Sequence, residues 1–169
     1  DNEGDGFSAG GALAVYEGQG TATSCTFAHN GASLWGEPNY GGTVFTREGT
    51  IVLAACIITG AWGRDWEGGD PLPANAAAAY QGTITATECD VWGNGENWSG
   101  PLAGQDGHDG NFSANPCFCD TTAGDFHLCA DSWCAPENNV AHPGVLVGAL
   151  PVGCAACDCE EGPTAVSGA

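Results

Sequence analysis

Cysteine is the residue of this chain with the most varied chemistry, and most of the ten cysteines gather near the C-terminal end. The closest spacing is Cys154-Ala-Ala-Cys157-Asp-Cys159, with Cys117-Phe-Cys119 as a second group. Two closely spaced pairs of thiolates are what a structural zinc site requires. In an exported protein the same cysteines are oxidised to disulfides, and we favour this interpretation. The sequence Cys-x-x-Cys-His is absent, which excludes covalent haem attachment of that type.

Carboxylates offer a second kind of chemistry, because they gather in two glycine-rich loops. Calcium takes about six to eight oxygen ligands, which such loops can supply. Neither loop has the spacing of an EF-hand or of a calcium-binding nonapeptide repeat, and a solvated acidic rim is the alternative interpretation. Calcium therefore stays a possible ligand, and we expect no other cofactor. The candidate ligands are Asp65, Glu67 and Asp70 in one loop, and Asp106 and Asp109 in the other.

Catalytic groups are sparse along the chain. A lyase that acts on uronates needs a base near the abstracted proton and cations for the carboxylates, yet Arg47 and Arg64 are the only arginines and lysine is absent. The one compact carboxylate–imidazole cluster, Asp106-Gly-His108-Asp109, is better interpreted as a turn. We expect a protein without catalytic residues, with a polysaccharide lyase or a paired-carboxylate glycoside hydrolase as the third alternative.

The charge balance excludes several classes of partner. The 169 residues carry 21 Asp and Glu against 2 Lys and Arg, which gives a formal net charge of −19. Nucleic-acid binding requires basic side chains that neutralise phosphates, and docking on an anionic membrane requires them too. No apolar stretch approaches the ~18 residues of a membrane span. We expect no nucleic-acid partner and no membrane span.

The chain begins with Asp1 and contains no methionine, which we interpret as a mature, exported chain after removal of a signal peptide. The expected location is extracellular or at the cell surface, where cysteines form disulfides. We predict at least four disulfides in the protein. The candidates are Cys25, Cys56, Cys89, Cys117, Cys119, Cys129, Cys134, Cys154, Cys157 and Cys159.

Internal repetition organises the first half of the chain. Gly10-Gly11-Ala12 precedes Cys25 by the same distance as Gly41-Gly42-Thr43 precedes Cys56, which gives a period of 31. A weaker third copy, marked by Cys89, follows at a spacing of 33. Each copy contains short runs rich in Thr, Val and Ile between glycine turns, a pattern typical of β-strands.

A copy of this size cannot bury its own apolar face, so equivalent strands must stack in parallel on those of the neighbouring copies. The sequence therefore predicts an all-β fold, a parallel β-helix solenoid of about three coils in which three cysteines stack inward. The end of a solenoid requires a cap, and the cysteine-rich segment is the candidate. The predicted divisions are residues 1–110 for the coils, 111–154 for the disulfide-stapled cap and 155–169 for a tail.

Two groups of motifs carry a resemblance to known proteins. Gly10-Gly11-Ala12 with Cys25-Thr26-Phe27, repeated at Gly41-Gly42-Thr43 with Cys56, resembles the right-handed parallel β-helix repeats of bacterial surface proteins, including polymorphic outer-membrane proteins. The order of the motifs between residues 111 and 154 resembles the closing coil of secreted bacterial β-helix proteins. This second resemblance is carried by Asn115-Pro116, Phe118-Cys119, Gly124-Asp125-Phe126, Cys134-Ala135-Pro136 and Gly153-Cys154.

The resemblance implies a right-handed β-helix with a cysteine-rich closing coil. Sequence spacing leaves the disulfide connectivity open. Our hypothesis joins Cys119 to Cys134, and either Cys129 or Cys117 to Cys154.

Two features of the sequence indicate possible contact with sugars, either attached to the chain or bound by it. The triplets at Asn97 and Asn111 are glycosylation sequons. Six tryptophans occur, mostly in loops, where they either stack on sugars or cover the side of the solenoid. A carbohydrate-binding or adhesive surface module is therefore the alternative function.

The leading hypothesis is an extracellular structural protein that assembles end to end into a fibre or surface layer. Residues 1–9 align with the loop that precedes each Gly-Gly pair, so the first coil is expected to present an open edge that a neighbouring copy covers. The high negative charge opposes this packing unless salt or calcium screens it. The candidate interface residues are Phe7, Leu13 and Val15 at the edge, and Thr164 and Val166 in the tail.

Overall fold

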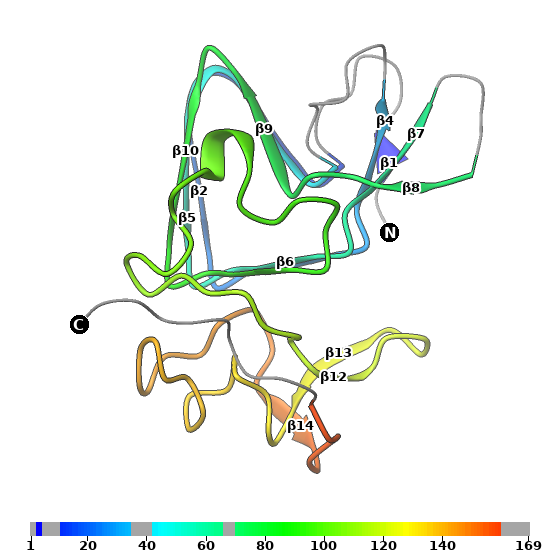
Figure 1. Cartoon of the computed structure of the whole chain (residues 1–169), viewed down its shortest axis with the longest axis vertical. Coiled ribbons are helices and arrows are strands. Elements are labelled where there is room, and N and C mark those ends of the chain that lie inside the picture. Colours follow the sequence, from blue (N-terminus) through cyan, green and yellow to red (C-terminus); the bar gives the residue numbers. More distant parts are fainter. Residues whose placement is uncertain (1–2, 5–10, 35–41, 66–69, 160–169) are drawn as a thin grey trace.

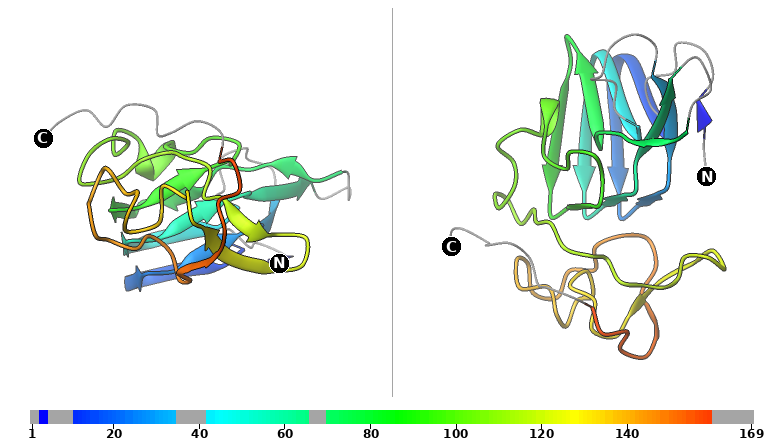
Figure 2. Two further views of the ribbon diagram at one scale, coloured as in Figure 1. Left: turned by 90° about the horizontal axis from the view of Figure 1, so that it is seen from below. Right: turned by 45° about the vertical axis from the view of Figure 1, so that its right-hand side comes forward.

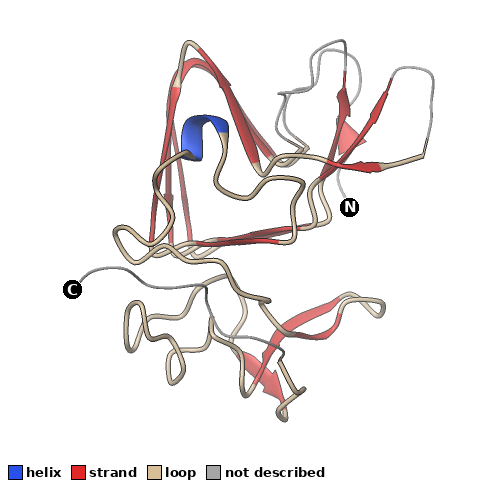
Figure 3. Ribbon diagram, in the orientation of Figure 1, coloured by secondary structure: helices blue, strands red, loops and turns tan. Residues whose placement is uncertain are grey.

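The computed structural model of the chain describes residues 3–4, 11–34, 42–65 and 70–159. The described residues are all-β apart from one short 3-10 helix, η1 (Gly100–Leu102). The strands form four small sheets, of which two contain only parallel pairs and two are mixed (Figures 1 and 3). In this part of the chain, no helix has the length and apolarity needed to cross a bilayer.

The largest sheet consists of the equivalent strands of the three sequence copies. Its order is β10 (Thr83–Thr87), β5 (Val44–Ala54) and β2 (Leu13–Thr23), and β9 (Ala77–Tyr80) also pairs with β5. All these pairs are parallel, with Gly18 opposite Gly49 and Thr83 opposite Thr50. The repeat spacings of 31 and 33 inferred from the sequence therefore set the register in which these strands pair.

In two further sheets, parallel strands also stack in the order in which they occur along the chain. One stacks β3 (Thr26–Ala28), β6 (Ile57–Thr59) and β11 (Asp90–Trp92) in parallel. The other contains the parallel strands β1 (Glu3–Gly4), β4 (Gly31–Leu34) and β7 (Trp62–Asp65), with β8 (Leu72–Pro73) antiparallel to β7.

The turns between strands lie at equivalent positions of each copy and use left-handed backbone. Positive φ angles recur at three stacked sets of residues, including non-glycine residues that pay a steric cost for this conformation. These sets align at the same two spacings as the strands. They are Glu17, Glu48 and Gln81; Ser24, Ala55 and Glu88; and His29, Gly60 and Gly93.

Glycine is required where neighbouring copies touch. A Cβ on Gly11 would lie 2.2 Å from the Gly31 carbonyl oxygen and 2.7 Å from that of Gly42. A Cβ on Gly42 would lie 2.9 Å from the Trp62 carbonyl oxygen. Gly11 and Gly42, the second glycines of the two Gly-Gly pairs, therefore permit a close approach between backbones that a side chain would block.

The core lies between these sheets and is made of inward-facing residues in register. Ala22, Leu53 and Ala86 form one row of this core, and each is buried. Leu102 of η1 is fully buried against the third copy. Gln105 also covers the third copy, because its side-chain amide donates to the Ile84 carbonyl at 2.9 Å and accepts from the Ala86 N–H at 2.7 Å.

The C-terminal segment forms the fourth sheet, in which β13 (Asp125–Cys129) pairs with antiparallel β12 (Phe118–Asp120) and parallel β14 (Val152–Cys154). It lies beside the stacked strands, below β6 in Figure 1 and in the right-hand view of Figure 2. We expected residues 111–154 to close the end of the stack. In the structure η1 and the residues after it cover the third copy as far as Phe112, which forms a parallel bridge with Asp90 of β11, and the rest of the segment packs on a flank.

Candidate functional site

The C-terminal segment contains three disulfides: Cys117–Cys159, Cys119–Cys154 and Cys129–Cys157. The expected pairing of Cys119 with Cys134 is wrong, as is the pairing of Cys154 with Cys129 or Cys117. The expectation of at least four disulfides is also wrong, because the other four cysteines are free thiols. Sequence spacing could not give this pairing, since it depends on β14 returning beside β13.

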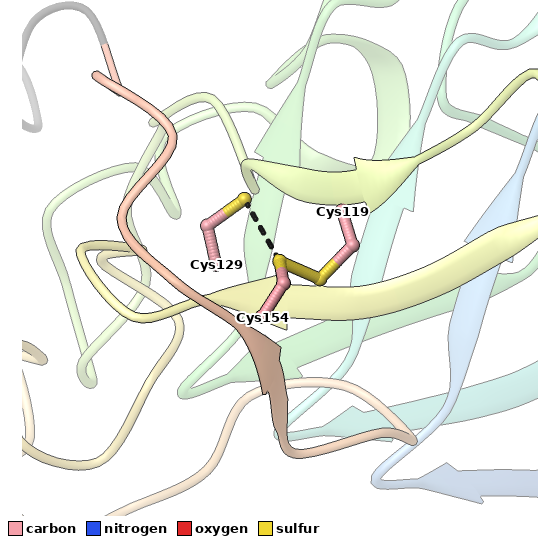
Figure 4. A group of neighbouring side chains, drawn as sticks. All are labelled: Cys119, Cys129 and Cys154. Atoms are coloured by element: carbon pink, nitrogen blue, oxygen red, sulfur yellow. Dashed lines mark hydrogen bonds between the residues drawn. A yellow bond between two sulfur atoms is a disulfide. The ribbon is translucent and has the colours of Figure 1, made fainter.

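The sulfur atoms of the disulfides lie close together. Cys154 Sγ is 3.5 Å from Cys129 Sγ (Figure 4) and 3.8 Å from Cys157 Sγ. The Cys119–Cys154 and Cys129–Cys157 disulfides are therefore in contact. Cys119, Cys129 and Cys154 are the one group in the described residues whose donor atoms are close enough to hold a metal ion. While they are oxidised they are not thiolates, which metal binding requires. The structure therefore favours a covalent staple.

Asp131 fixes the chain that carries the last two cysteines. Its two carboxylate oxygens accept the N–H groups of Cys157 at 2.9 Å and Cys159 at 3.1 Å. These hydrogen bonds lower the pKa of the Asp131 carboxyl, because they stabilise its charged form. The sequence analysis missed this residue, since the acceptor and its donors are separated by more than twenty positions.

The inward cysteines of the three copies form a ladder of free thiols. Cys56 and Cys89 are buried and Cys25 is half-buried at the outer end. The Cys56 N–H donates to Cys89 Sγ at 3.4 Å. The hydrogen bond with Cys56 and burial both raise the pKa of the Cys89 thiol, so Cys89 behaves as a small apolar residue. The predicted inward stack is present, and its cysteines are not disulfide-bonded.

The joint between the C-terminal segment and β11 contains a buried acid. Asp90 is fully buried, accepts the Ala114 N–H at 3.0 Å and lies 3.3 Å from Cys134 Sγ. Burial raises the pKa of the Asp90 carboxyl to about 7, although these hydrogen bonds oppose the rise. Burial also raises the pKa of the Cys134 thiol, and the charge of Asp90 adds to this effect. Both side chains of this dyad are fully buried in the joint.

Apolar contacts complete this joint. Ile57 of β6 belongs to a buried cluster with Leu128 and Val147 of the C-terminal segment. The Gly148 N–H donates to the Ala55 carbonyl at 2.8 Å, and the Ala149 N–H donates to Thr26 Oγ1 at 3.0 Å. The C-terminal segment is thus attached to the outer face of the β3–β6–β11 sheet.

The remaining predicted sites have mixed outcomes. Asn111 is fully buried and its amide donates to the Ala86 carbonyl at 2.8 Å, so its sequon is not accessible in the folded protein and this prediction is wrong. Asn97 is half-buried and stays a candidate for glycosylation.

Asp70, Asp106 and Asp109 are exposed and belong to no described metal-binding group, so calcium stays a hypothesis. Among the other candidates, Phe7, Glu67, Thr164, Val166 and the side chain of Asp65 lie outside the described residues.

The open edge of the stack is the feature that bears on assembly. Within the described residues β2 pairs with β5 on one side only. Leu13, Val15 and Phe27 pack against the core from this side and are half-buried, whereas their counterparts in the second copy, Val44 and Ile58 among them, are fully buried. An unpaired strand edge beside exposed core residues is a template for association.

A column of exposed side chains crosses the outside of the stack. Tyr16, Arg47 and Tyr80 lie in register on β2, β5 and β9. The Arg47 guanidinium carbon is 5.7 Å from the centre of the Tyr80 ring, a cation–π distance. The sequence analysis did not single out this column, although its spacings of 31 and 33 are those of the repeat.

A comparison with protein-family models found no match, and searches of curated proteins and of solved structures found none either. The open edge, the column of exposed side chains and the three disulfides are therefore the features of the molecule that bear on its function.

Proposed function

We propose that the protein is a non-catalytic extracellular structural protein, built as a right-handed parallel β-helix, that assembles end to end. The observation that carries this proposal is the open edge, where β2 has one strand neighbour in the described residues and Leu13 and Val15 are half-buried. The three disulfides favour an oxidising compartment, because cytosolic reductants keep thiols reduced.

The two ends of the stack differ, which favours a head-to-tail contact. The third copy is covered by Leu102 and Gln105, so it offers no equivalent strand edge. The neighbour must then contribute another segment to β2, and the tail with Thr164 and Val166 is the candidate. A contact between two different surfaces that does not close into a ring produces a filament.

Charge predicts how this assembly responds to solution conditions. A formal net charge of −19 makes the copies repel one another, so assembly requires salt that screens the charges or calcium that binds them. Sedimentation velocity over a range of protein and salt concentrations, with and without chelator, measures this dependence. We expect oligomers that lengthen with concentration and salt.

A matched pair of variants tests the role of the edge. Val15→Glu places a charge at the half-buried edge, where solvent reaches it in the single chain but not in the assembly. Val140→Glu makes the same change at an exposed site, since Val140 is 58% exposed. We expect Val15→Glu to abolish oligomers and Val140→Glu to retain them. A wild-type chain that stays monomeric under all these conditions would refute the proposal.

A carbohydrate-binding module is the second candidate, and the Tyr16–Arg47–Tyr80 column favours it. Aromatic rings provide flat apolar faces for sugars, and an arginine pairs with carboxylates. Arg47 already pairs with Glu48 at 3.5 Å and the chain has a formal net charge of −19, so a neutral polysaccharide is the preferred class of ligand. Affinity electrophoresis should show retardation by such a polymer that Tyr80→Ala removes and Leu72→Ala, at another exposed residue, leaves in place. Equal retardation of both variants would exclude the column as the binding site.

A further inference from the structure

The outer face of the largest sheet carries a regular array of threonines, which we name the threonine face. Three alternate positions on each of β2, β5 and β10 contribute to it, and all three strands are in register. Six of the nine residues are threonines, and none is charged. The threonine face consists of Gln19, Thr21 and Thr23; Thr50, Val52 and Ala54; and Thr83, Thr85 and Thr87.

The threonine face is open to solvent. Seven of its residues are exposed, and Thr50 and Ala54 are half-buried. The acidic corner residues Glu48 and Glu88 bound the face without lying on it. The face thus carries no charge, although the chain has a formal net charge of −19.

The array repeats in two directions. Neighbouring parallel strands lie about 4.8 Å apart, and alternate residues along a strand lie roughly 6.6 Å apart. β2, β5 and β10 nearly superpose in Figure 1, which looks along the stack, so little twist disturbs the rows. Threonine has a restricted χ1 angle, and the Thr83 hydroxyl donates to Thr50 Oγ1 at 3.2 Å. These restrictions favour a regular arrangement of the hydroxyls and methyls.

A lattice of water is the partner that fits such a surface. Each threonine hydroxyl both donates and accepts hydrogen bonds, as each water in ice does. The regular spacing between strands and along them gives a two-dimensional set of hydroxyls, which a crystalline lattice of water can match and disordered liquid water cannot. The methyl groups between the hydroxyls lose contact with liquid water when the face meets a solid, which stabilises the contact.

Other partners fit the threonine face less well. Polysaccharides stack on aromatic rings, and the rings of Tyr16 and Tyr80 lie outside it. Anionic surfaces require basic side chains, which the face lacks. We propose that the threonine face binds ice, an activity that does not depend on end-to-end assembly.

Measurement of thermal hysteresis and ice-crystal shape with the full chain tests this proposal. We expect a gap between the melting and freezing temperatures and faceted crystals. Thr85→Tyr, in the middle row of the face, should abolish both effects because the ring lifts the flat array away from the ice. Thr121→Tyr makes the same change at an exposed threonine of the β12–β13 turn and should leave both effects intact.

Folding of each variant is followed by far-ultraviolet circular dichroism. If Thr85→Tyr does not fold, Thr85→Ser replaces it, since serine retains the hydroxyl and loses only the methyl group and the χ1 restriction. The smaller change should reduce the hysteresis. Absence of hysteresis and of faceting in the wild-type chain would overturn the proposal, as would equal hysteresis in the wild type and the folded Thr85 variant.

Discussion

At the scale of single residues, Asp90 shows how burial converts an acid into a pH-sensitive contact. Its carboxyl has no exposed surface and faces the Ala114 N–H and the Cys134 thiol. No lysine or arginine lies beside it to stabilise its charge, since Arg47 and Arg64 are placed on β5 and β7. Asp90 therefore takes up a proton more readily in the folded than in the unfolded chain.

The sign of this effect predicts how stability depends on pH. The pKa of the carboxyl is 3.8 ordinarily and about 7 in the fold. As the pH rises from 4 to 7, the unfolded chain releases the proton while the folded chain retains it, so the free energy of unfolding falls. Above pH 7 both forms are ionised and the penalty stays constant, at about 4 kcal/mol in order of magnitude.

Asp90→Asn tests this prediction because the amide has the same shape and no charge. We expect the variant to gain stability relative to wild type between pH 4 and pH 8, by up to about 4 kcal/mol. Asp70→Asn, at an exposed residue, serves as the control and should show no such gain. Denaturant unfolding across this pH range measures the difference. If the free energy of unfolding depended on pH in the same way for Asp90→Asn and wild type, the prediction would be contradicted.

The cysteines give a second prediction at the residue scale. Cys25, Cys56, Cys89 and Cys134 are free thiols, three of them buried. Alkylation of the unfolded, unreduced protein followed by mass spectrometry should therefore label four cysteines. Labelling of the folded protein should be slow and begin at Cys25, because Cys25 is the only half-buried member of the group. If no cysteine of the unfolded chain were alkylated, the thiols of the ladder would be oxidised.

At the scale of elements, the repeat in the sequence predicts the strand pairing well. Cys25, Cys56 and Cys89 occupy equivalent places because in-register stacking requires like residues at like positions. The boundaries were less predictable. The runs rich in Thr, Val and Ile do not indicate the break at Ser24, which has a positive φ and separates β2 from β3. Sequence patterns locate apolar runs, but serine gives no signal for a left-handed turn.

The C-terminal elements were the least predictable. Their position depends on contacts such as that of Ile57 with Val147, which join residues far apart in the chain. The same limit applies to the candidate sites, because Asn111 reads as a surface sequon until its contact with Ala86 is known. Asp90 and Asp131 carry no local motif either. The partners of these side chains lie far away in the sequence, so local sequence patterns do not predict them.

Alternation along β5 gives a prediction for the central strand. Leu53 faces the core and is fully buried, while its neighbour Val52 faces outward and is 39% exposed. Leu53→Ala should lower the free energy of unfolding by roughly 2–5 kcal/mol, because it removes packed methyl groups and leaves a cavity. Val52→Ala should change it by about 0.5 kcal/mol or less. Equal losses in denaturant unfolding would show that β5 is not oriented as described.

At the scale of the whole molecule, the protein combines two differently stabilised parts. The stacked strands have an apolar core and contain no disulfide among the described residues before Cys117. The C-terminal segment has few strands and three disulfides, and it contacts the stack through one sheet face. A part with a small core depends on its disulfides, which stabilise it largely by restricting the unfolded chain.

Removal of the disulfide between β12 and β14 should therefore affect the two parts unequally. In the double variant Cys119→Ser and Cys154→Ser, the C-terminal segment should lose about 2–4 kcal/mol of stability. Amide hydrogen exchange should then accelerate in β12, β13 and β14, and in β6 where Ile57 becomes exposed, while β5 and β10 retain their protection. Cys25→Ser, at a half-buried free thiol, is the control and should leave exchange in the C-terminal segment unchanged. Faster exchange throughout the stacked strands of the double variant would instead show that both parts unfold as one cooperative unit.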